Sequence, residues 1–402
     1  MQAVGVVAEY NPFHNGHTYH VQQAKKQAHA DIVIVAISGH FLQRGEPALV
    51  DKWTRTAMAL QAGVDIVIEL PYLFSTASAQ KFAYGGVALL HALRCHSIAF
   101  GSEAGELQPF LNSLSLIRQN RQTYEAEIQS AIQTGVSYPK AMHLAYEKLT
   151  QIHPSDYVDL TQPNNVLALH YIEAIERIQS PITPITFNRV GAHYYDELQY
   201  DSQIASATSI RKALLTNKSL QQIKQFLPYT SYTLLQQWQA KQQTFIDWEI
   251  FWPFLQHTII RSSAEQLTTF ADVTEGLQFS LLKHATNAVS FQSFMKQLKS
   301  KRYTWTRLQR MLTHIFTGIT KEQLQTHSEP SYIRLLGMTE QGQTYLSTYK
   351  KQFSLPIISR VAAVKDDLLT VDIRATNMYQ LGTHLLKKNG IGNDYTIPPI
   401  RI

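Results

Sequence analysis

The sequence is poor in the residues that mark secreted or membrane-bound proteins. It contains one cysteine, Cys95, among 402 residues, which excludes an internal disulfide framework and fits a reducing compartment. No run approaches the ~20 apolar residues that span a bilayer. The first residues lead directly into an apolar stretch, without the charged region and cleavage site of a signal peptide. We therefore expect a cytoplasmic protein with no membrane partner, in which Cys95 is a small buried hydrophobe.

Acidic residues are scarce in the second half of the chain. The net charge is +6 overall. Residues 1–215 contain 15 Lys and Arg against 18 Asp and Glu, a net of −3, whereas residues 216–402 contain 21 against 12, a net of +9. The basic excess therefore lies entirely in the second half, where nucleic acid is the expected partner. On charge alone, a merely soluble basic domain is the alternative.

The first half alternates short apolar, β-branched runs with helical patterns. The expected strands are residues 3–8, 31–37, 64–70, 97–101 and 185–189, and the expected helices are residues 17–30, 52–62, 82–93 and 165–178. Continuous apolar strands joined by crossover helices predict an α/β fold with a Rossmann-like parallel sheet covered on both faces. Ligands of such sheets bind beyond the carboxyl ends of the strands.

The alternation stops near Leu215. Helical patterns dominate residues 220–336, and a mixed tail follows with a possible strand at residues 369–373. Pattern and charge therefore predict two domains, residues 1–215 and a basic, mainly helical region of residues 216–402.

The strongest chemical signal follows the first expected strand, where the chain reads Glu9-Tyr10-Asn11-Pro12-Phe13-His14-Asn15-Gly16-His17. A helix starts near Gly16, and its free N–H groups and positive dipole end suit a phosphate. His14 and His17 are placed to donate hydrogen bonds to charge developing on an α-phosphate. Two alternatives are a metal site of His14, His17 and His20, which lacks a local acidic or cysteine ligand, and histidines that only cap or pack.

A second phosphate-binding element is predicted in Ala205-Ser206-Ala207-Thr208-Ser209-Ile210-Arg211. Its Ser and Thr residues can cap a helix start whose N–H groups cradle β- and γ-phosphates, and Arg211 adds a fork of donors. A plain helix cap with a solvent-exposed arginine is the alternative. The presence of His-x-Gly-His earlier in the chain favours the phosphate interpretation.

Further candidates follow expected strands or open a helix. Gly101 either lies against an adenine or ribose or is an ordinary turn glycine. Asn164 or Asn165 either reads adenine or ribose or caps its helix. Arg189 ends the last expected strand and would point towards the phosphates. The polar loop of residues 38–47 either shapes the pocket of the second substrate or acyl group or is a surface loop.

Together with Ile68-Glu69-Leu70-Pro71 and Phe100-Gly101-Ser102-Glu103, these segments resemble the bacterial tRNA(Met) cytidine acetate ligase family, within the His-x-Gly-His nucleotidylyltransferase superfamily. The resemblance is specific over residues 1–215 and weaker through residues 302–310. It implies that acetate and ATP, with Mg²⁺, give acetyl-adenylate and pyrophosphate. The exocyclic amine of the wobble cytidine of elongator tRNA(Met) then takes the acetyl group to give N(4)-acetylcytidine, without acetyl-CoA. No Lys-Met-Ser-Lys-Ser loop is present, which argues against an aminoacyl-tRNA synthetase.

The motifs and the resemblance together give the expected site. His14 and His17 are the catalytic candidates, because adenylate formation needs positioning and charge stabilisation rather than a protein nucleophile. No protein metal ligands are expected, because Mg²⁺ is held largely by phosphates and water. The expected ATP-binding residues are Val7, Ala8, Glu9, Tyr10, Asn11, Pro12, Phe13, His14, Asn15, Gly16, His17, Thr18, Tyr19, His20, Gly101, Asn164, Asn165, Arg189, Ser206, Thr208, Ser209 and Arg211.

The basic region offers an RNA-binding surface. Residues 276–321 contain no Asp or Glu, and Tyr303 and Trp305 lie among the basic residues there. These aromatics either stack on unpaired anticodon-loop bases or belong to a helical core. The expected tRNA-binding residues are Lys296, Lys299, Lys301, Arg302, Arg307 and Arg310. Two other functions stay open: a nucleotidylyltransferase that adenylylates a phosphorylated small molecule in cofactor synthesis, and a non-catalytic RNA-binding protein on this scaffold.

Overall fold

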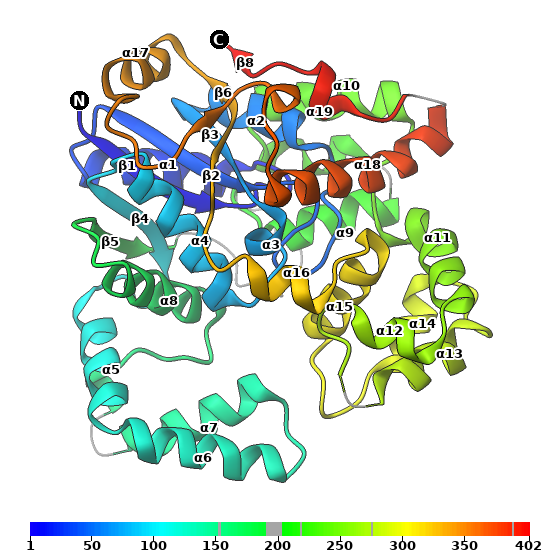
Figure 1. Ribbon diagram of the computed structural model, residues 1–402. Coiled ribbons are helices and arrows are strands. Elements are labelled where there is room, and N and C mark those ends of the chain that lie inside the picture. The colour runs from blue at the N-terminus through cyan, green and yellow to red at the C-terminus, as the bar shows by residue number, and fades with distance from the viewer. Residues whose placement is uncertain (152–153, 190–202, 218, 275, 388–389) are drawn as a thin grey trace.

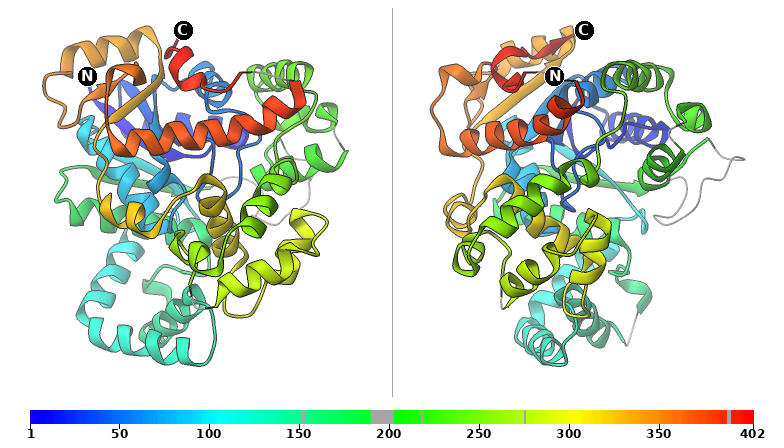
Figure 2. Two further views of the ribbon diagram at one scale, coloured as in Figure 1. Left: turned by 45° about the vertical axis from the view of Figure 1, so that its right-hand side comes forward. Right: turned by 90° about the vertical axis from the view of Figure 1, so that its right-hand side faces the viewer.

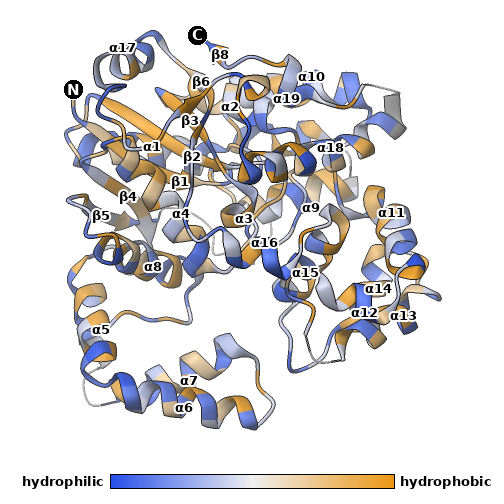
Figure 3. Cartoon of the chain, in the orientation of Figure 1, coloured by the Kyte–Doolittle hydropathy of each residue, from blue (hydrophilic) through white to orange (hydrophobic). Residues whose placement is uncertain are grey.

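A central mixed sheet organises the computed structural model, which describes residues 1–151, 154–189, 203–217, 219–274, 276–387 and 390–402. The strand order is β5-β4-β1-β2-β3-β6-β7, and β8 pairs with β6. Helices cover both faces of the sheet (Figures 1 and 2). Its inner strands form the most apolar part of the chain (Figure 3), as expected for strands covered on both sides.

The first five strands form the expected parallel sheet. They are β1 (Ala3–Ala8), β2 (Ile32–Ser38), β3 (Ile66–Leu70), β4 (Ser97–Ser102) and β5 (Thr183–Asn188), and their pairings are all parallel. The helices that follow β1 to β3 and precede β5 are α1 (Asn15–Gln27), α2 (Lys52–Gln61), α4 (Ala79–Ala92) and α8 (Pro163–Arg177). The Rossmann-like α/β fold is therefore confirmed. Strand order reverses between β1 and β4, which is where ligands of such sheets bind.

The second half of the chain adds three strands to this sheet, which the sequence did not indicate. β6 (Ile333–Met338) pairs antiparallel with β3, and β7 (Ile357–Ile358) and β8 (Ile400–Arg401) pair parallel with β6. One hydrophobic core extends from β1 into the helices of the second half. The pattern change near Leu215 therefore marks neither the edge of the sheet nor the edge of its core.

The rest of the second half is mainly helical, as expected. α9 (Ala207–Asn217) crosses the boundary near Leu215. The longer helices after it are α10 (Tyr229–Gln242), α11 (Trp248–Arg261), α13 (Leu277–Ala285), α14 (Phe291–Leu298), α15 (Trp305–Thr317), α17 (Glu340–Tyr349) and α18 (Asp367–Lys387). Shorter ones are η2 (Leu220–Phe226), α12 (Ala264–Thr269), α16 (Lys321–Thr326), η3 (Val361–Ala363) and α19 (Asn393–Thr396).

The strand expected at residues 369–373 is wrong, because these residues lie in α18. The carboxylate of Asp366 accepts a hydrogen bond from the Leu369 N–H at 2.9 Å and so caps the helix start. Leu368, Val371 and Ala375 are buried at helical spacing. The cap and this spacing outweigh the β-branched residues that suggested a strand.

A helical arm is inserted between β4 and α8, where no element was expected. It consists of α5 (Gln108–Gln119), α6 (Arg121–Gln133) and α7 (Tyr138–Thr150), and it extends away from the sheet (Figure 1). Its own small core includes Tyr124, Ile128 and Tyr146. The short α3 (Tyr72–Ser75) and η1 (Pro154–Asp156) complete the first half. No helix in the described part of the chain has the length and apolar character needed to cross a membrane.

A buried ionic cluster joins the two halves of the chain. The ammonium group of Lys52 donates hydrogen bonds to both carboxylate oxygens of Glu69, at 2.7 and 2.9 Å, and to Asp394 at 2.9 Å. It also lies 3.2 Å from the hydroxyl of Thr376, and the Lys52 side chain is fully buried. Burial lowers the pKa of Lys52, but Asp394 and Glu69 outweigh it and the net shift is upward. Glu69 of the Ile68-Glu69-Leu70-Pro71 segment therefore has a structural role.

We predict that Lys52→Met destabilises the protein, because it leaves the buried carboxylate of Glu69 without its hydrogen-bonded cation and Asp394 with only the Arg334 guanidinium, 3.6 Å away. Breaking a buried ion pair in this way costs about 3–5 kcal/mol. Urea unfolding measures the change, with Lys26→Met on the exposed surface of α1 as the control, for which a change within about 0.5 kcal/mol is expected. Equal losses from the two substitutions would contradict the structural role of the cluster.

Candidate active site

His14 and His17 lie at the start of α1 and hold each other in place. The Nδ1 atom of His14 accepts a hydrogen bond from the Gly16 N–H at 3.1 Å, and the Nδ1 atom of His17 accepts one from the His14 N–H at 3.3 Å. Their ring centroids are 3.8 Å apart. Because both Nδ1 atoms act as acceptors, the proton of each neutral ring resides on Nε2. The two side chains are therefore arranged as Nε2–H donors.

Gly16 permits this arrangement. A Cβ atom at this position would lie 2.8 Å from Cε1 of the His14 ring, closer than packed carbon atoms approach one another. A glycine is therefore required here to keep His14 over the helix start, which agrees with its place in the motif.

The site histidines are neutral. Burial, followed by the charges of Arg189 and Arg211, lowers the pKa of His14 to about 3. Burial, followed by His14 and Arg189, holds the pKa of His17 well below its ordinary value. The pKa of His20 falls to about 4 through burial and Arg189. In the described chain no group of three or more His, Cys, Asp or Glu side chains is placed to hold a metal ion, so the structure gives no support to a three-histidine metal site.

The segment before α9 meets the His-x-Gly-His segment directly. The Arg211 guanidinium donates a hydrogen bond at 3.0 Å to the carbonyl oxygen of Asn11, some 200 residues earlier in the chain. Ser206 caps the helix, and its hydroxyl accepts the Ser209 N–H at 3.1 Å. Thr208 lies one turn before Arg211, 3.5 Å from its guanidinium. The structure therefore brings together the two elements that the sequence proposed for phosphates.

The ends of β4 and β5 meet the start of α8 beside these histidines. Arg189 follows β5, and its guanidinium donates a hydrogen bond to the Asn164 side-chain oxygen at 2.9 Å. A Cβ atom at Gly101 would lie 2.8 Å from Cγ of Arg189, so the absence of a side chain makes room for the arginine. Arg189, Gly101 and Asn164 therefore belong to one surface at the carboxyl ends of the strands.

The two adjacent asparagines differ in what they contact. The side-chain oxygen of Asn165 accepts the N–H groups of Glu103 and Ala104, at 3.0 and 3.1 Å, and its amide donates to the carbonyl oxygen of Asp159 at 3.0 Å. Asn165 is buried and holds the turn after β4. Asn164 instead bonds Arg189 and the Glu103 carboxylate. Sequence reasoning left this pair unresolved and did not include Glu103 among the site residues, although Glu103 ends the Phe100-Gly101-Ser102-Glu103 segment.

The loop of residues 38–47 is not a surface loop. His40, Phe41, Leu42, Gly45 and Pro47 are buried. The Glu46 carboxylate forms an ion pair with Arg211 at 2.9 Å. The Gln43 N–H donates a hydrogen bond to the Glu9 carboxylate at 2.8 Å, and burial raises the pKa of Glu9. Sequence reasoning missed Glu46 as an active-site contact, although the unusual polarity of the loop was a signal for it.

The basic side chains of the second half fall into two groups. Lys296, in the last turn of α14, and Lys299, Lys301 and Arg302, between α14 and α15, are exposed. Arg307 donates a hydrogen bond to Thr274 at 3.1 Å, and Arg310 pairs with Asp272 at 2.9 Å with a side chain that is 14% exposed. The Arg310 side chain is therefore largely buried, whereas the side chains of Lys296, Lys299, Lys301 and Arg302 are exposed to solvent.

The two aromatic residues beside these charges also differ. Tyr303 is buried and lies 4.8 Å from the Arg307 guanidinium, so stacking of Tyr303 on RNA bases is not available in this structure. Trp305 is 38% exposed at the first turn of α15.

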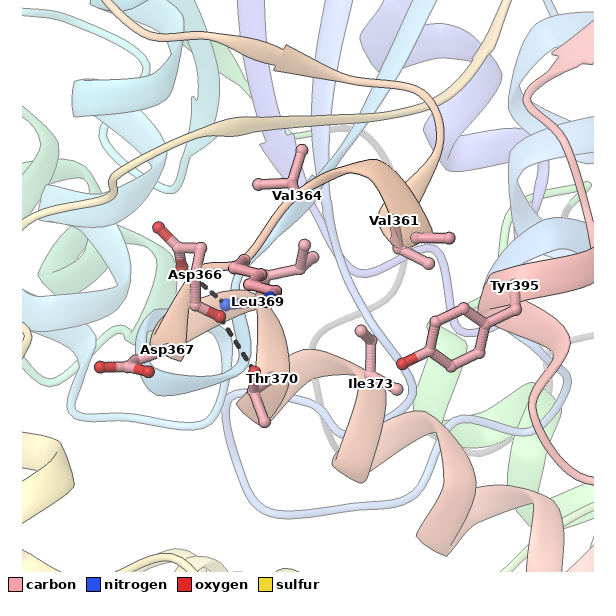
Figure 4. A pocket seen from close by; sticks show the side chains of 10 residues that line it. Val361, Val364, Asp366, Asp367, Leu369, Thr370, Ile373 and Tyr395 are labelled. Atoms are coloured by element: carbon pink, nitrogen blue, oxygen red, sulfur yellow. Dashed lines mark hydrogen bonds between the residues drawn. The ribbon is translucent and has the colours of Figure 1, made fainter.

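A separate pocket of about 500 Å³ lies at the start of α18 (Figure 4). Val361, Asp366, Ile373 and Tyr395 are among the residues that line it, and Asp366 faces Thr370 within it. None of its lining residues belongs to the histidine site.

Comparisons with known proteins agree with this geometry. A family model described as HIGH Nucleotidyl Transferase matches residues 1–394. The tRNA(Met) cytidine acetate ligase of Lysinibacillus sphaericus is 56% identical over 402 residues, covering 100% of both chains, and that of Bacillus subtilis is 42% identical over 389 residues, covering 95% of this chain and 92% of the relative. The crystal structure of apo Thermotoga maritima TmcAL matches with a TM-score of 0.92 at 30% identity over 100% of both chains. The same protein bound with alpha-thio ATP matches with a TM-score of 0.91 at 29% identity, again over 100% of both chains.

A parallel sheet with His-x-Gly-His at its topological switch point defines a nucleotidyl transferase of the HIGH class. Within that class, the chain belongs to the tRNA(Met) cytidine acetate ligase family, since its relatives of that name match it along their whole length. The protein is accordingly a ligase. This assignment leaves no observation that favours a cofactor-synthesis enzyme or a non-catalytic RNA-binding protein.

We predict that His14 makes the protein less stable in acid. The unfolded chain takes up a proton near pH 6.5, whereas the folded chain keeps His14 neutral to about pH 3. Stability is therefore full above pH 6.5 and falls by about 1.4 kcal/mol per pH unit between these values. His14→Asn retains a capping side chain but cannot titrate, so its unfolding free energy should depend less steeply on pH by that amount. Urea unfolding at pH 7, 6 and 5 measures the two slopes, and equal slopes would contradict a neutral, buried His14.

Proposed function

We propose that the protein uses ATP to activate acetate as acetyl-adenylate and transfers the acetyl group to the wobble cytidine of elongator tRNA(Met), giving N(4)-acetylcytidine. The observation that carries the proposal is the meeting of two neutral histidine donors with Arg189 and Arg211 at the switch point of the sheet. The basic, exposed surface of the second half supports RNA as the acceptor.

In the first half-reaction, an acetate oxygen attacks the α-phosphorus of ATP and the bond to pyrophosphate breaks. Arg211 and the N–H groups at the start of α9 bind the β- and γ-phosphates, where a planar guanidinium matches phosphate geometry. His14 and His17 donate Nε2–H bonds to the oxygens of the α-phosphate as negative charge grows there. Asn164 binds on the adenosine side of the site, and Arg189, which donates a hydrogen bond to it, faces the phosphates. Asn165 positions the turn that carries Glu103.

In the second half-reaction, the cytidine amine attacks the acetyl carbon and the bond to AMP breaks. AMP leaves with the electron pair of that bond, so no acetyl-CoA is needed. Histidines and arginines that surround the phosphate region suit anions rather than a metal ion, so Mg²⁺ would be bound through ATP phosphates and water. The protein would act in the cytoplasm, where its tRNA substrate is found.

For RNA binding we propose Lys296, Lys299, Lys301 and Arg302, with Arg307 at the edge of the surface and Trp305 as the stacking residue. The first four are exposed and neighbour the start of α15, as Trp305 does. Arg310 is omitted, because its guanidinium is largely buried and already forms an ion pair with Asp272. Lys and Arg on such a surface bind phosphates, and an exposed indole stacks on an unpaired base.

We predict that His17→Ala lowers acetyl-adenylate formation on the order of 100-fold or more, because it removes one transition-state donor. The measurement is thin-layer detection of adenylate from labelled ATP and acetate, with and without tRNA. His257→Ala, on the exposed side of α11, serves as the matched control. Adenylate that forms with acetate and disappears when tRNA is added supports both half-reactions. Full pyrophosphate release by His17→Ala would contradict the catalytic role of His17. AMP transfer to a phosphorylated metabolite instead of acetate would contradict the proposed reaction.

We predict that Lys299→Glu with Arg302→Glu weakens tRNA binding and makes it less dependent on salt. Each phosphate contact contributes about 0.7–0.9 to the slope of log K against log salt, so the slope should fall by roughly 1.5 for two contacts. The control is Lys350→Glu with Lys351→Glu, an equal charge change at the exposed end of α17. Filter binding between low and moderate salt measures both pairs, and an equal loss from the control pair would place the RNA elsewhere or make its binding non-specific.

A further inference from the structure

Residues 44–46 contact both Arg211, which is proposed to bind phosphates, and the helices α11 and α15. The Glu46 carboxylate pairs with Arg211 at 2.9 Å, and the side chains of these residues are 33% and 15% exposed. The same guanidinium donates to the Asn11 carbonyl oxygen at 3.0 Å. Arg211 is thus held from two directions, by the His-x-Gly-His segment and by Glu46.

The two residues before Glu46 are held by α11 and α15. The Gly45 carbonyl oxygen accepts hydrogen bonds from the Trp248 indole N–H and the Thr313 hydroxyl, both at 2.8 Å. The Arg44 carbonyl oxygen accepts one from the Gln309 amide at 2.9 Å. All three donor side chains are buried, so these bonds fix the loop backbone firmly.

Gly45 packs closely against the backbone of α15. Its φ is +77°, and a Cβ atom there would lie 2.5 Å from the backbone N and Cα of Arg310. Only glycine tolerates this conformation and this approach. Backbone hydrogen bonds between Leu42 and Glu46, at 2.9 Å, and between Gly45 and Leu42, at 2.9 Å, close the turn. A displacement of α15 would therefore be transmitted to Glu46.

We propose that Glu46 is a positioning residue that sets Arg211 against the ATP phosphates, and that α15 fixes Glu46 through Gly45. Glu46 itself would not touch ATP, because a guanidinium has enough donors to hold a carboxylate and a phosphate together. α15 carries Trp305 at its exposed end, so RNA bound there steadies the helix, the loop and finally Arg211. ATP and tRNA therefore bind cooperatively, and each raises the affinity of the other by the same factor. This inference rests on the proposed function.

A double-mutant cycle tests the positioning role in acetate-dependent exchange of pyrophosphate into ATP. Glu46→Ala should lower kcat on the order of 10- to 100-fold, as misplacement of a catalytic contact does, and Glu46→Asp should restore part of it. In an Arg211→Ala background, Glu46→Ala should cause no further loss, because Glu46 acts only through that arginine. Losses that multiply in the double variant would overturn the proposal. Absence of exchange in the unmodified enzyme would instead overturn the proposed function, so the two failures are distinguishable.

A second measurement tests the connection to α15. Trp248→Phe with Thr313→Val removes both donors to Gly45. Thr313→Val retains the side-chain volume, whereas Trp248→Phe keeps a buried aromatic ring that is smaller than the indole. Thr317→Val, one turn further along α15, is the matched loss of a buried hydroxyl. In the unmodified enzyme, tRNA should tighten ATP binding by on the order of 10-fold. The Thr317→Val enzyme should keep this factor and the double variant should lose it. Equal cooperativity in the double variant, or none in the unmodified enzyme, would overturn the connection.

Discussion

The contact between the two halves of the chain depends on the buried ammonium group of Lys52, which forms ion pairs with Glu69 and Asp394. A lysine without any exposed surface stays charged only if carboxylates surround it, and Glu69 comes from β3 while Asp394 comes from the last helix of the chain. This ion cluster places the C-terminal segment against the edge of the parallel sheet, where β6 pairs with β3 in antiparallel register. β6, β7 and β8 of the second half therefore extend the parallel sheet, and the helices that carry the proposed RNA-binding residues have a defined position relative to the proposed ATP site.

That defined position explains why the polar loop after β2 is buried. Residues 38–47 fill the space between the carboxyl ends of the strands and α11 and α15, and their carbonyl oxygens are hydrogen-bonded by side chains from those helices. A buried loop needs such partners, because unpaired backbone groups are costly away from water. The sequence of the loop, glycine at the closest contact and glutamate opposite Arg211, satisfies both neighbours simultaneously. The surfaces proposed for the two half-reactions are consequently joined by one hydrogen-bonded loop.

The parallel sheet and the chemistry-bearing turns could be predicted from the sequence, because each is encoded locally. Five apolar, β-branched runs mark β1 to β5, and His14, Gly16 and His17 lie at one turn. Contacts between distant segments could not be predicted. The residues of β6 have a pattern that is typical of the end of a helical region. They form a strand because they pair with β3, which lies more than 260 residues earlier in the chain. In the same way, the residues next to Arg310 in the sequence do not indicate its ion pair with Asp272, and those next to Tyr303 do not indicate that Tyr303 is buried. Asn165 and Asn164 are equivalent in sequence and differ only because Glu103 and Arg189 approach from other strands.

The arginines and the histidines of the site have different electrostatic roles. In the proposed reaction, Arg189 and Arg211 attract the phosphates of ATP in the ground state and the transition state alike. Their presence, after burial, keeps the histidine pKa low, so His14 and His17 remain neutral donors. A neutral donor interacts modestly with a phosphate oxygen, and the bond strengthens as that oxygen gains charge. Charged histidines would add to ground-state binding, whereas neutral, pre-positioned ones favour the transition state selectively. In the proposed mechanism, the hydrogen bonds accepted by both Nδ1 atoms contribute to catalysis, because they orient each Nε2–H before the reaction begins.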